Sequence, residues 1–297
     1  MAGERNLMAV GLQGAGKTTF AAALWYVVDS GEFPTVLSKG RHIGDHQYLE
    51  TLAKRWEDGW QVPRTKSLDK HMVTMNLRSP GSTDDVALSF ADLSGETFEK
   101  AFVTRTLSKH AASAFDGVEG LMLFVSASHP KDDLTMIEFA MELEEDVDED
   151  TLIDTSEEEP FDPAKTPRQV QIVDFLDSIR QGPLSVDLQR IAVIISAWDK
   201  STIKDDPRRW LAEKMALLEQ YLSNSGIEMR VYGVSAQGGD LPDFDNPPLP
   251  GDTIGEKERP ALLSLRRASE RVRVVGYGAE QHDLTHPVRW LSGLESE

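Results

Sequence analysis

Short apolar runs alternate along the chain with longer segments in which apolar residues recur every three or four positions. Several of the short runs are apolar without interruption, which is typical of central strands covered on both faces. We predict strands at residues 7–10, 72–77, 86–92, 121–125, 191–196, 229–234 and 272–275. We predict helices at residues 17–28, 48–56, 98–115, 170–179 and 210–222. This order predicts an α/β sheet with crossover helices.

Two stretches interrupt this pattern. Residues 131–162 contain fifteen acidic residues and one basic residue, and blocks of like charge with few aromatic residues favour a solvated segment. We expect a mobile insertion at about 131–166 that acts as a spacer, with binding of a basic partner as the alternative. The stretch "GGDLPDFDNPPLPGD" at 238–252 is too rich in Pro, Gly and Asp for regular structure. We expect one domain over residues 1–297 that contains both interruptions.

The composition is that of a globular protein and excludes several classes. The chain has 297 residues, of which 40% are hydrophobic and 27% charged. Its net charge of −19 disfavours binding to nucleic acid or anionic lipid. The longest apolar run, at 20–28, is far shorter than the roughly 20 residues of a membrane helix. The chain has no cysteine and begins without a secretory signal, so we expect a cytoplasmic protein with no disulfide.

The segment "GLQGAGKTT" lies between the first predicted strand and the first predicted helix and matches the pattern G-x-x-x-x-G-K-[ST]. Phosphate oxygens need inward-pointing backbone N–H groups, which requires glycines at positions of close approach, and a helix N-terminus adds a positive dipole end. In such a loop Lys17 bridges the β- and γ-phosphates and the Thr18 hydroxyl binds Mg²⁺. A simple Gly-rich turn is the alternative. The predicted phosphate-binding residues are Gly11, Gln13, Gly14, Ala15, Gly16, Lys17, Thr18 and Thr19.

A second metal anchor is expected at the end of a neighbouring strand. In "VALSFADLSGE", Asp92 ends an apolar run and Gly95 follows at the D-x-x-G spacing. We predict that Asp92 holds a Mg²⁺ water and that the Gly95 N–H senses the γ-phosphate. Thr65, which follows Arg64 in a polar loop, is the candidate for a switch residue that closes over Mg²⁺. An ordinary loop threonine is the alternative for Thr65.

Residues for base recognition follow two later strands. "RIAVIISAWDK" ends with Asp199 and Lys200 where guanine-binding proteins carry N-K-x-D, and the carboxylate is the group that accepts the guanine N1 and N2 hydrogens. "VYGVSAQGG" leads into Ser235, Ala236 and Gln237, at the place where an S-A-K offers a backbone N–H to guanine O6. The same letters nearly spell the nucleophile elbow G-x-S-x-G, but Gln237 occupies its fifth position, which disfavours a serine hydrolase.

Four segments together, "GLQGAGKTT", "DLSGE", "SAWDK" and "GVSAQGG", resemble the GTPase domains of the TRAFAC clade. More narrowly, the chain is similar to the bacterial double-GTPase group of conflict-system operons, including "LWYVVDSGE", "VPRT" and "HDLTHPVRWL". This resemblance covers most of the chain outside the acidic insertion. It implies a P-loop NTPase fold with a Ras-like, mostly parallel sheet and helices on both faces. It also implies GTP and GDP as ligands, Mg²⁺, and a second GTPase or an adaptor as partner.

The sequence departs from the family pattern at the base site and at the residue that positions the attacking water. Ser196 and Ala197 replace Asn and Lys, and Gln237 replaces Lys, which weakens the expectation of strict guanine selectivity. Glu96 stands where Ras-like proteins usually carry a water-positioning Gln. Its carboxylate can accept a hydrogen bond from water but adds negative charge, so a cation is needed, and Arg64 and Arg105 are the candidates.

We therefore expect a slow, Mg²⁺-dependent GTPase that acts as a molecular switch, with Lys17, Glu96 and Arg64 in catalytic roles. Two alternatives share the phosphate site. An ATPase would not need Asp199, so nucleotide competition separates it from a GTPase. A nucleotide-binding scaffold without turnover would release no phosphate in a single-turnover experiment.

Overall fold

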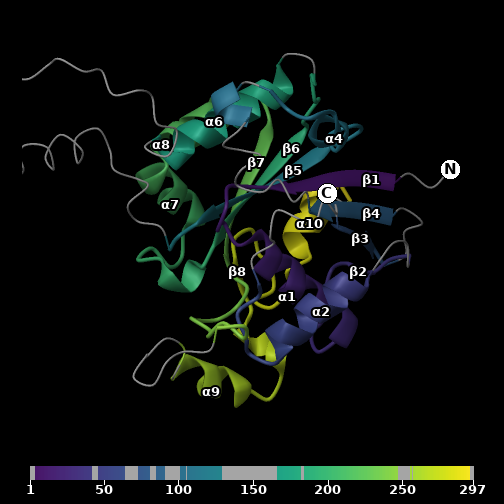
Figure 1. The fold of residues 1–297 in the computed structure, drawn as a ribbon, viewed down its shortest axis with the longest axis vertical. Coiled ribbons are helices and arrows are strands. Elements are labelled where there is room, and N and C mark those ends of the chain that lie inside the picture. Colours follow the sequence, from purple (N-terminus) through teal and green to yellow (C-terminus); the bar gives the residue numbers. More distant parts are fainter. Residues whose placement is uncertain are drawn as a thin grey trace, which may run out of the picture.

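The computed structural model describes residues 4–41, 46–63, 73–80, 85–90, 101–104, 106–128, 166–181, 184–246, 255 and 257–294, and the observations below refer to them. Eight strands form one sheet (Figure 1). They are β1 (Glu4–Val10), β2 (Ser38–Lys39), β3 (Val73–Arg78), β4 (Asp85–Phe90), β5 (Gly120–Ser126), β6 (Arg190–Ser196), β7 (Glu228–Ser235) and β8 (Arg273–Val275). Their spatial order is β2-β3-β4-β1-β5-β6-β7-β8.

The centre of the sheet is parallel and its borders are antiparallel. β4, β1, β5, β6 and β7 pair in parallel, whereas β2 and β3 on one side and β8 on the other pair antiparallel. The carboxyl ends of the five parallel strands therefore meet at one edge of the sheet, where open α/β sheets bind ligands. The segments that follow β1, β6 and β7 carry the predicted phosphate and base residues.

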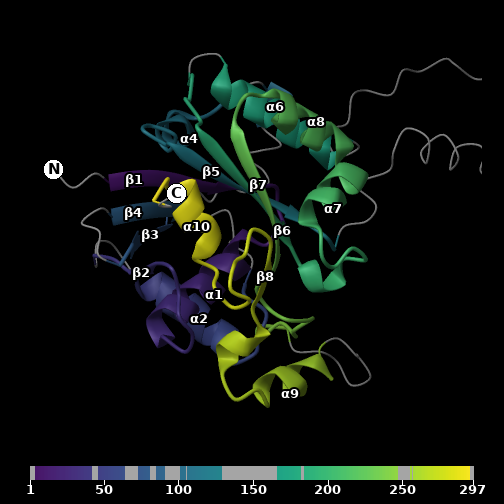
Figure 2. The same ribbon diagram turned by 180° about the vertical axis from the view of Figure 1, so that it is seen from behind.

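Helices cover both faces of this sheet (Figures 1 and 2). One face carries α1 (Lys17–Ser30), α2 (Gln47–Glu57) and α10 (His286–Leu291). The other face carries α4 (Lys109–Ser113), α6 (Arg168–Arg180), α7 (Pro207–Lys214) and α8 (Ala216–Asn224). The short helices η4 (Trp198–Lys200), α9 (Glu258–Leu263) and η5 (Ala268–Arg271) lie in the connections. The α/β fold with a mostly parallel sheet and helices on both faces is confirmed.

The continuous apolar runs of the sequence are explained by burial on both faces. In β5 the side chains of Met122 and Phe124 enter the core beneath α1. Their neighbours Leu121, Leu123 and Val125 enter the core beneath α6. Because successive strand residues point to opposite faces, both sets must be apolar when helices cover both sides.

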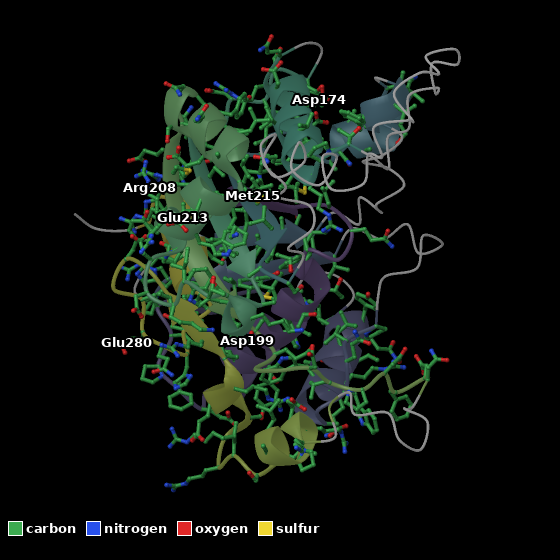
Figure 3. All side chains as sticks on the ribbon, turned by 90° about the vertical axis from the view of Figure 1, so that its left-hand side faces the viewer. Asp174, Asp199, Arg208, Glu213, Met215 and Glu280 are labelled. Carbon is green, nitrogen blue, oxygen red and sulfur yellow. The ribbon has the colours of Figure 1, made fainter. Side chains whose placement is uncertain are left out.

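Two predicted helices differ in the structure. The expected helix at 210–222 is divided into α7 and α8 at Met215, whose φ of −136° and ψ of 56° are not helical (Figure 3). The Met215 side chain is buried, and the change of direction lets both helices bury their apolar residues in one core. The helix expected at 98–115 is also interrupted, because residues 106–108 are not helical and Ser108 Oγ accepts a hydrogen bond from Ala111 N at the start of α4.

The predicted interruptions are described only in part. Residues 238–246 form neither helix nor strand, as expected, whereas 247–252 lie outside the described residues. The acidic insertion lies outside them as well, apart from Thr166. The pattern did not predict β2, α9 or α10. Within the described ranges, every helix is too short or too polar to pass through a membrane.

Candidate nucleotide site

The loop between β1 and α1 is built on glycines that other residues cannot replace without rearrangement. Gly11, Gly14 and Gly16 have φ of 154°, 76° and 90°, a region that favours glycine. A Cβ at Gly11 would lie 2.6 Å from the carbonyl oxygen of Phe124 in β5. A Cβ at Gly16 would lie 2.9 Å from Oγ of Ser196 in β6. The loop is thus packed against the ends of two neighbouring strands, and its backbone has the turns that a phosphate cradle requires.

Lys17 is the first residue of α1 and folds back over this loop. Its Nζ donates hydrogen bonds to the carbonyl oxygens of Gly11, at 2.5 Å, and Leu12, at 3.2 Å. The first turn of α1 contains no acidic residue, so no carboxylate there offsets the positive end of the helix dipole. Lys17 and this helix end therefore place positive charge beside the glycines, and Thr18 and Thr19 follow in the same turn. Gln13 is exposed and Ala15 is buried.

Asp199 and Ser235 come together at the carboxyl ends of β6 and β7. Ser235 Oγ donates a hydrogen bond of 2.6 Å to Asp199 Oδ1. Ser235 is buried and Asp199 is exposed. The backbone carbonyl of Asp199 accepts a 2.7 Å hydrogen bond from Lys204 Nζ. The Ser235 hydrogen bond therefore orients the Asp199 carboxylate, which is exposed at this edge of the sheet (Figure 3 labels Asp199).

The turn into Asp199 is anchored by a buried tryptophan. Ala197 has φ of 50°, a left-handed conformation that is strained for a residue with a Cβ. The next residue, Trp198, packs so closely on Gly233 of β7 that a Cβ there would overlap the indole. Its Nε1 donates a 3.0 Å hydrogen bond to the carbonyl oxygen of Lys204. Packing of Trp198 in the core thus stabilises the strained turn that presents Asp199.

The remaining base-site residues interact with the loop after β7. Lys200 Nζ forms a 2.6 Å ion pair with Asp240. Gln237 Nε2 donates to the carbonyl oxygen of Gly239 at 2.9 Å. Ala236 is buried, and its carbonyl oxygen accepts a 2.7 Å hydrogen bond from Trp56 Nε1. Sequence reasoning missed Trp56, because a tryptophan at an apolar position of α2 has the signature of an ordinary core residue.

Part of the predicted site lies outside the described ranges of the chain. The residues concerned are Arg64, Thr65, Asp92, Gly95, Glu96 and Arg105. The described part of β4 ends at Phe90, which pairs with Ala9 of β1, so the chain approaches the edge that carries the glycine loop. Thr18, Thr65 and Asp92 are the residues predicted to bind Mg²⁺, and of these Thr18 lies within the described ranges. Among the described residues, no three or more His, Asp or Glu side chains are grouped in a way that could hold a metal ion.

The chain is similar to known proteins in both sequence and fold. The sequence model of the family Double-GTPase 1 matches residues 8–291, a range that includes the glycine loop, Asp199 and residues 235–237. No curated protein gives a significant match.

Many solved structures are similar to this chain, among them the following two. One is the Arl6 BBS3 small GTPase from Trypanosoma brucei with the bound nucleotide analogue GppNp, with 10% identity and a TM-score of 0.36 over 79% of this chain and 88% of that chain. The other is the bacterial selenocysteine-specific elongation factor EF-Sec, with 12% identity and a TM-score of 0.36 over 79% of this chain and 26% of that chain.

Proposed function

Because the chain belongs to the Double-GTPase 1 family, and so to the GTPase-type nucleotide-binding proteins with a P-loop fold, we propose that it hydrolyses GTP as a molecular switch. The observation that carries this proposal is the glycine loop before α1. Gly11 and Gly16 pack against β5 and β6 so closely that a Cβ at either position would be too near its neighbours. This geometry supports a cradle of backbone N–H groups for phosphates, with Lys17 at its side.

Lys17 has the central binding role in this proposal. Its Nζ now donates to two loop carbonyls, Gly11 and Leu12, and thus lies beside the cradle. A triphosphate would offer oxygens with greater negative charge, so the ammonium group would turn to the β- and γ-phosphates. Backbone N–H groups from Gln13 to Thr19 would hold the remaining phosphate oxygens.

The base would lie at the ends of β6 and β7. Asp199 would accept hydrogen bonds from guanine N1 and N2, and the Ala236 N–H would donate to O6. The hydrogen bond from Ser235 supports this role, because it orients the Asp199 carboxylate. Ser196 and Ala197 provide no lysine stem to cover the base. We therefore propose a preference for guanine that is weaker than in proteins with the complete N-K-x-D motif.

Thr18, Thr65 and Asp92 are the residues that we assign to Mg²⁺. A hydroxyl group and a carboxylate are hard oxygen donors, which Mg²⁺ prefers, and Thr18 follows Lys17 in the first turn of α1. When bound, the ion would neutralise part of the phosphate charge.

For hydrolysis we propose in-line attack of water on the γ-phosphorus. The new P–O bond forms as the bond to the β–γ bridging oxygen breaks, which yields GDP and inorganic phosphate. Glu96 would accept a hydrogen bond from the water, and Arg64, Arg105 or a cation from a partner would offset its charge. Without an arginine from a partner, such sites turn over at about 10⁻⁴ to 10⁻² per second.

A slow rate of GTP hydrolysis is suited to a switch whose nucleotide state is recognised by a partner. We propose that the segments around Thr65 and around residues 92–96 order with GTP and relax after hydrolysis. The family suggests a second GTPase or an adaptor in a bacterial conflict system as the partner. We propose that residues 1–297 form one GTPase domain that contains the acidic insertion at about 131–166.

A single-turnover experiment tests hydrolysis directly. Excess protein is mixed with GTP or ATP and Mg²⁺, and released phosphate is measured over hours. We expect release from GTP, slower release with Glu96→Ala, and unchanged release with the control Glu157→Ala, which removes a charge from the acidic segment. Nucleotide binding without any phosphate release would instead identify a scaffold, and faster release from ATP would identify an ATPase.

A further inference from the structure

A buried tryptophan from a distant part of the chain contacts the loop that follows β7. Trp56 lies in the last turn of α2 and its side chain is fully buried. Its indole Nε1 donates a 2.7 Å hydrogen bond to the carbonyl oxygen of Ala236. Ala236 directly follows Ser235, the residue that contacts Asp199. The backbone beside the proposed base site is therefore held by a side chain that lies outside every recognised motif.

Trp56 is itself fixed from two sides. The guanidinium group of Arg271, in η5, lies 4.1 Å from the centre of the Trp56 ring. The same group donates hydrogen bonds to the backbone carbonyls of Trp56, at 2.7 Å, and Glu57, at 2.8 Å, and thereby caps the end of α2. The ring of Tyr26, on α1, lies 5.0 Å from the ring of Trp56, measured between their centres. These contacts leave the indole one orientation, with its N–H toward Ala236.

The end of α2 and η5 hold the same loop at further points. Gly238 has φ of 88°, and a Cβ there would lie 3.0 Å from the Arg271 backbone oxygen. The backbone N–H of Gln61, just after α2, donates a 2.9 Å hydrogen bond to the carbonyl oxygen of Pro242. Arg55 forms a 3.0 Å ion pair with Asp245. The loop after β7 is thus positioned by α2 and η5 over most of its described length.

We propose that Trp56 is a positioning residue for recognition of the purine 6-position. The Ala236 N–H lies between two anchored groups: the Ser235 side chain is bonded to Asp199, and the Ala236 carbonyl is bonded to Trp56. Fixing both flanks restricts rotation about the Ala236 backbone and therefore aims its N–H at O6 of guanine. This inference rests on the proposed function, because it assigns a specificity-determining residue to the same base site.

The test separates recognition of O6 from recognition of the 2-amino group. Dissociation constants of the full chain are measured for GDP, for 6-thio-GDP, whose sulfur is a weak acceptor, and for IDP, which lacks the 2-amino group. Trp56→Phe keeps a ring beneath Arg271 but removes the N–H. It should weaken GDP binding about tenfold and 6-thio-GDP binding much less, so that the GDP preference over 6-thio-GDP falls about fivefold or more. The preference for GDP over IDP, which depends on Asp199, should persist.

Two further variants keep the test decisive. Replacement of Trp56 by 3-benzothienylalanine retains the shape of the indole and exchanges the N–H for sulfur. This variant removes the hydrogen bond without a change in packing, so it is used if Trp56→Phe lowers the stability of the protein. The matched control is Trp25→Phe, since Trp25 is buried in the same core and its ring stacks on His46 at 5.0 Å. The control should lower the melting temperature without changing the GDP to 6-thio-GDP ratio.

The results distinguish this inference from the proposed function. If both Trp56 variants bind GDP and 6-thio-GDP with the parent ratio, or if Trp25→Phe changes that ratio as much, the positioning role of Trp56 is overturned while the GTPase proposal stands. If the parent protein itself binds no GDP, the proposed function fails and this inference fails with it.

Discussion

The hydroxyl group of Ser235 donates a 2.6 Å hydrogen bond to the carboxylate of Asp199. Ser235 is the last residue of β7, Asp199 follows β6, and the two residues meet where these neighbouring parallel strands end. Ser235 is buried whereas Asp199 is exposed, so the hydrogen bond connects the core to the outer carboxylate. A carboxylate in one orientation can recognise two adjacent donors, such as N1 and N2 of guanine.

This relationship predicts a specific loss of guanine binding in Ser235→Ala. Without the hydroxyl group the carboxylate rotates more freely, and ordering such a side chain on binding costs about 0.5–1.5 kcal/mol. We expect GDP affinity to fall up to about tenfold and ATP affinity to stay unchanged, as measured by calorimetric titration. Asp199→Ala should abolish the preference for GTP over ATP.

The matched control is Ser201→Ala. Ser201 is also buried, and its hydroxyl group donates a 2.7 Å hydrogen bond to the carbonyl oxygen of Ile203. This variant should lose some stability and retain the nucleotide ranking. An unchanged ranking in Asp199→Ala as well would remove Asp199 from the base site.

The packing of the glycine loop predicts a large difference in the free energy of unfolding between two glycine-to-alanine variants. Gly11→Ala places a Cβ 2.6 Å from the Phe124 carbonyl oxygen in β5, whereas Gly226→Ala meets no atom within 4 Å. Both glycines have positive φ, so both variants incur backbone strain of about 1–3 kcal/mol. Overpacking adds about 1–3 kcal/mol for Gly11→Ala alone. Urea unfolding measures both free energies, and equal losses would contradict the observed packing of the loop.

The hydrogen bonds around the Glu32 carboxyl group predict that the stability of the folded protein depends on pH. Burial alone would raise the pKa of its carboxyl group, but hydrogen bonds from the Ser269 N–H, at 2.9 Å, and the Tyr26 hydroxyl, at 3.0 Å, outweigh burial and lower the pKa below 4.5. A lowered pKa in the folded state means that the ionised group stabilises the fold above its unfolded pKa. This contribution is lost as the pH falls through the folded pKa.

Melting temperatures of parent and Glu32→Gln are measured from about pH 3 to about pH 8, an interval that spans the titration of carboxyl groups near pH 4. The two curves should differ most at neutral pH and approach each other in acid. Glu280→Gln is the control, because Glu280 is exposed and its carboxylate has no hydrogen bond from the described residues (Figure 3). A constant difference between parent and Glu32→Gln at every pH would contradict the assignment.

Much of the fold could be predicted because it depends on local patterns. The uninterrupted apolar runs of β5 and β6 result from burial on both faces, and the glycines of residues 11–16 mark backbone that approaches β5 and β6 closely. The break at Met215 could not be predicted, because the apolar spacing from 211 to 222 fits one helix as well as two. The direction change at Met215 depends on packing against α6 and the sheet, which the local sequence does not contain.

The proximity of two candidate site residues was predictable in the same way. Ser235 and Asp199 were expected from their places after two strands, since parallel strands present their carboxyl ends at one edge. Trp56 and Arg271 were not, because their contacts join segments 180 and 215 residues apart. A tryptophan in a helix and an arginine in a polar stretch give no local sign of such contacts. The roles of all the site residues in nucleotide binding remain predictions, and Asp92, Glu96 and Thr65 also lie outside the described residues.

The central claim is that the loop before α1 binds a nucleotide through Lys17, and thermal unfolding tests it most directly. A ligand that binds the native state raises the melting temperature. Parent protein and Lys17→Ala are melted with GTP, GDP or ATP, each with and without Mg²⁺. We predict that GTP and GDP raise the melting temperature of the parent more than ATP does, and that Lys17→Ala, although folded, shows no shift. Equal shifts in both proteins, or none in the parent with any nucleotide, would contradict the account.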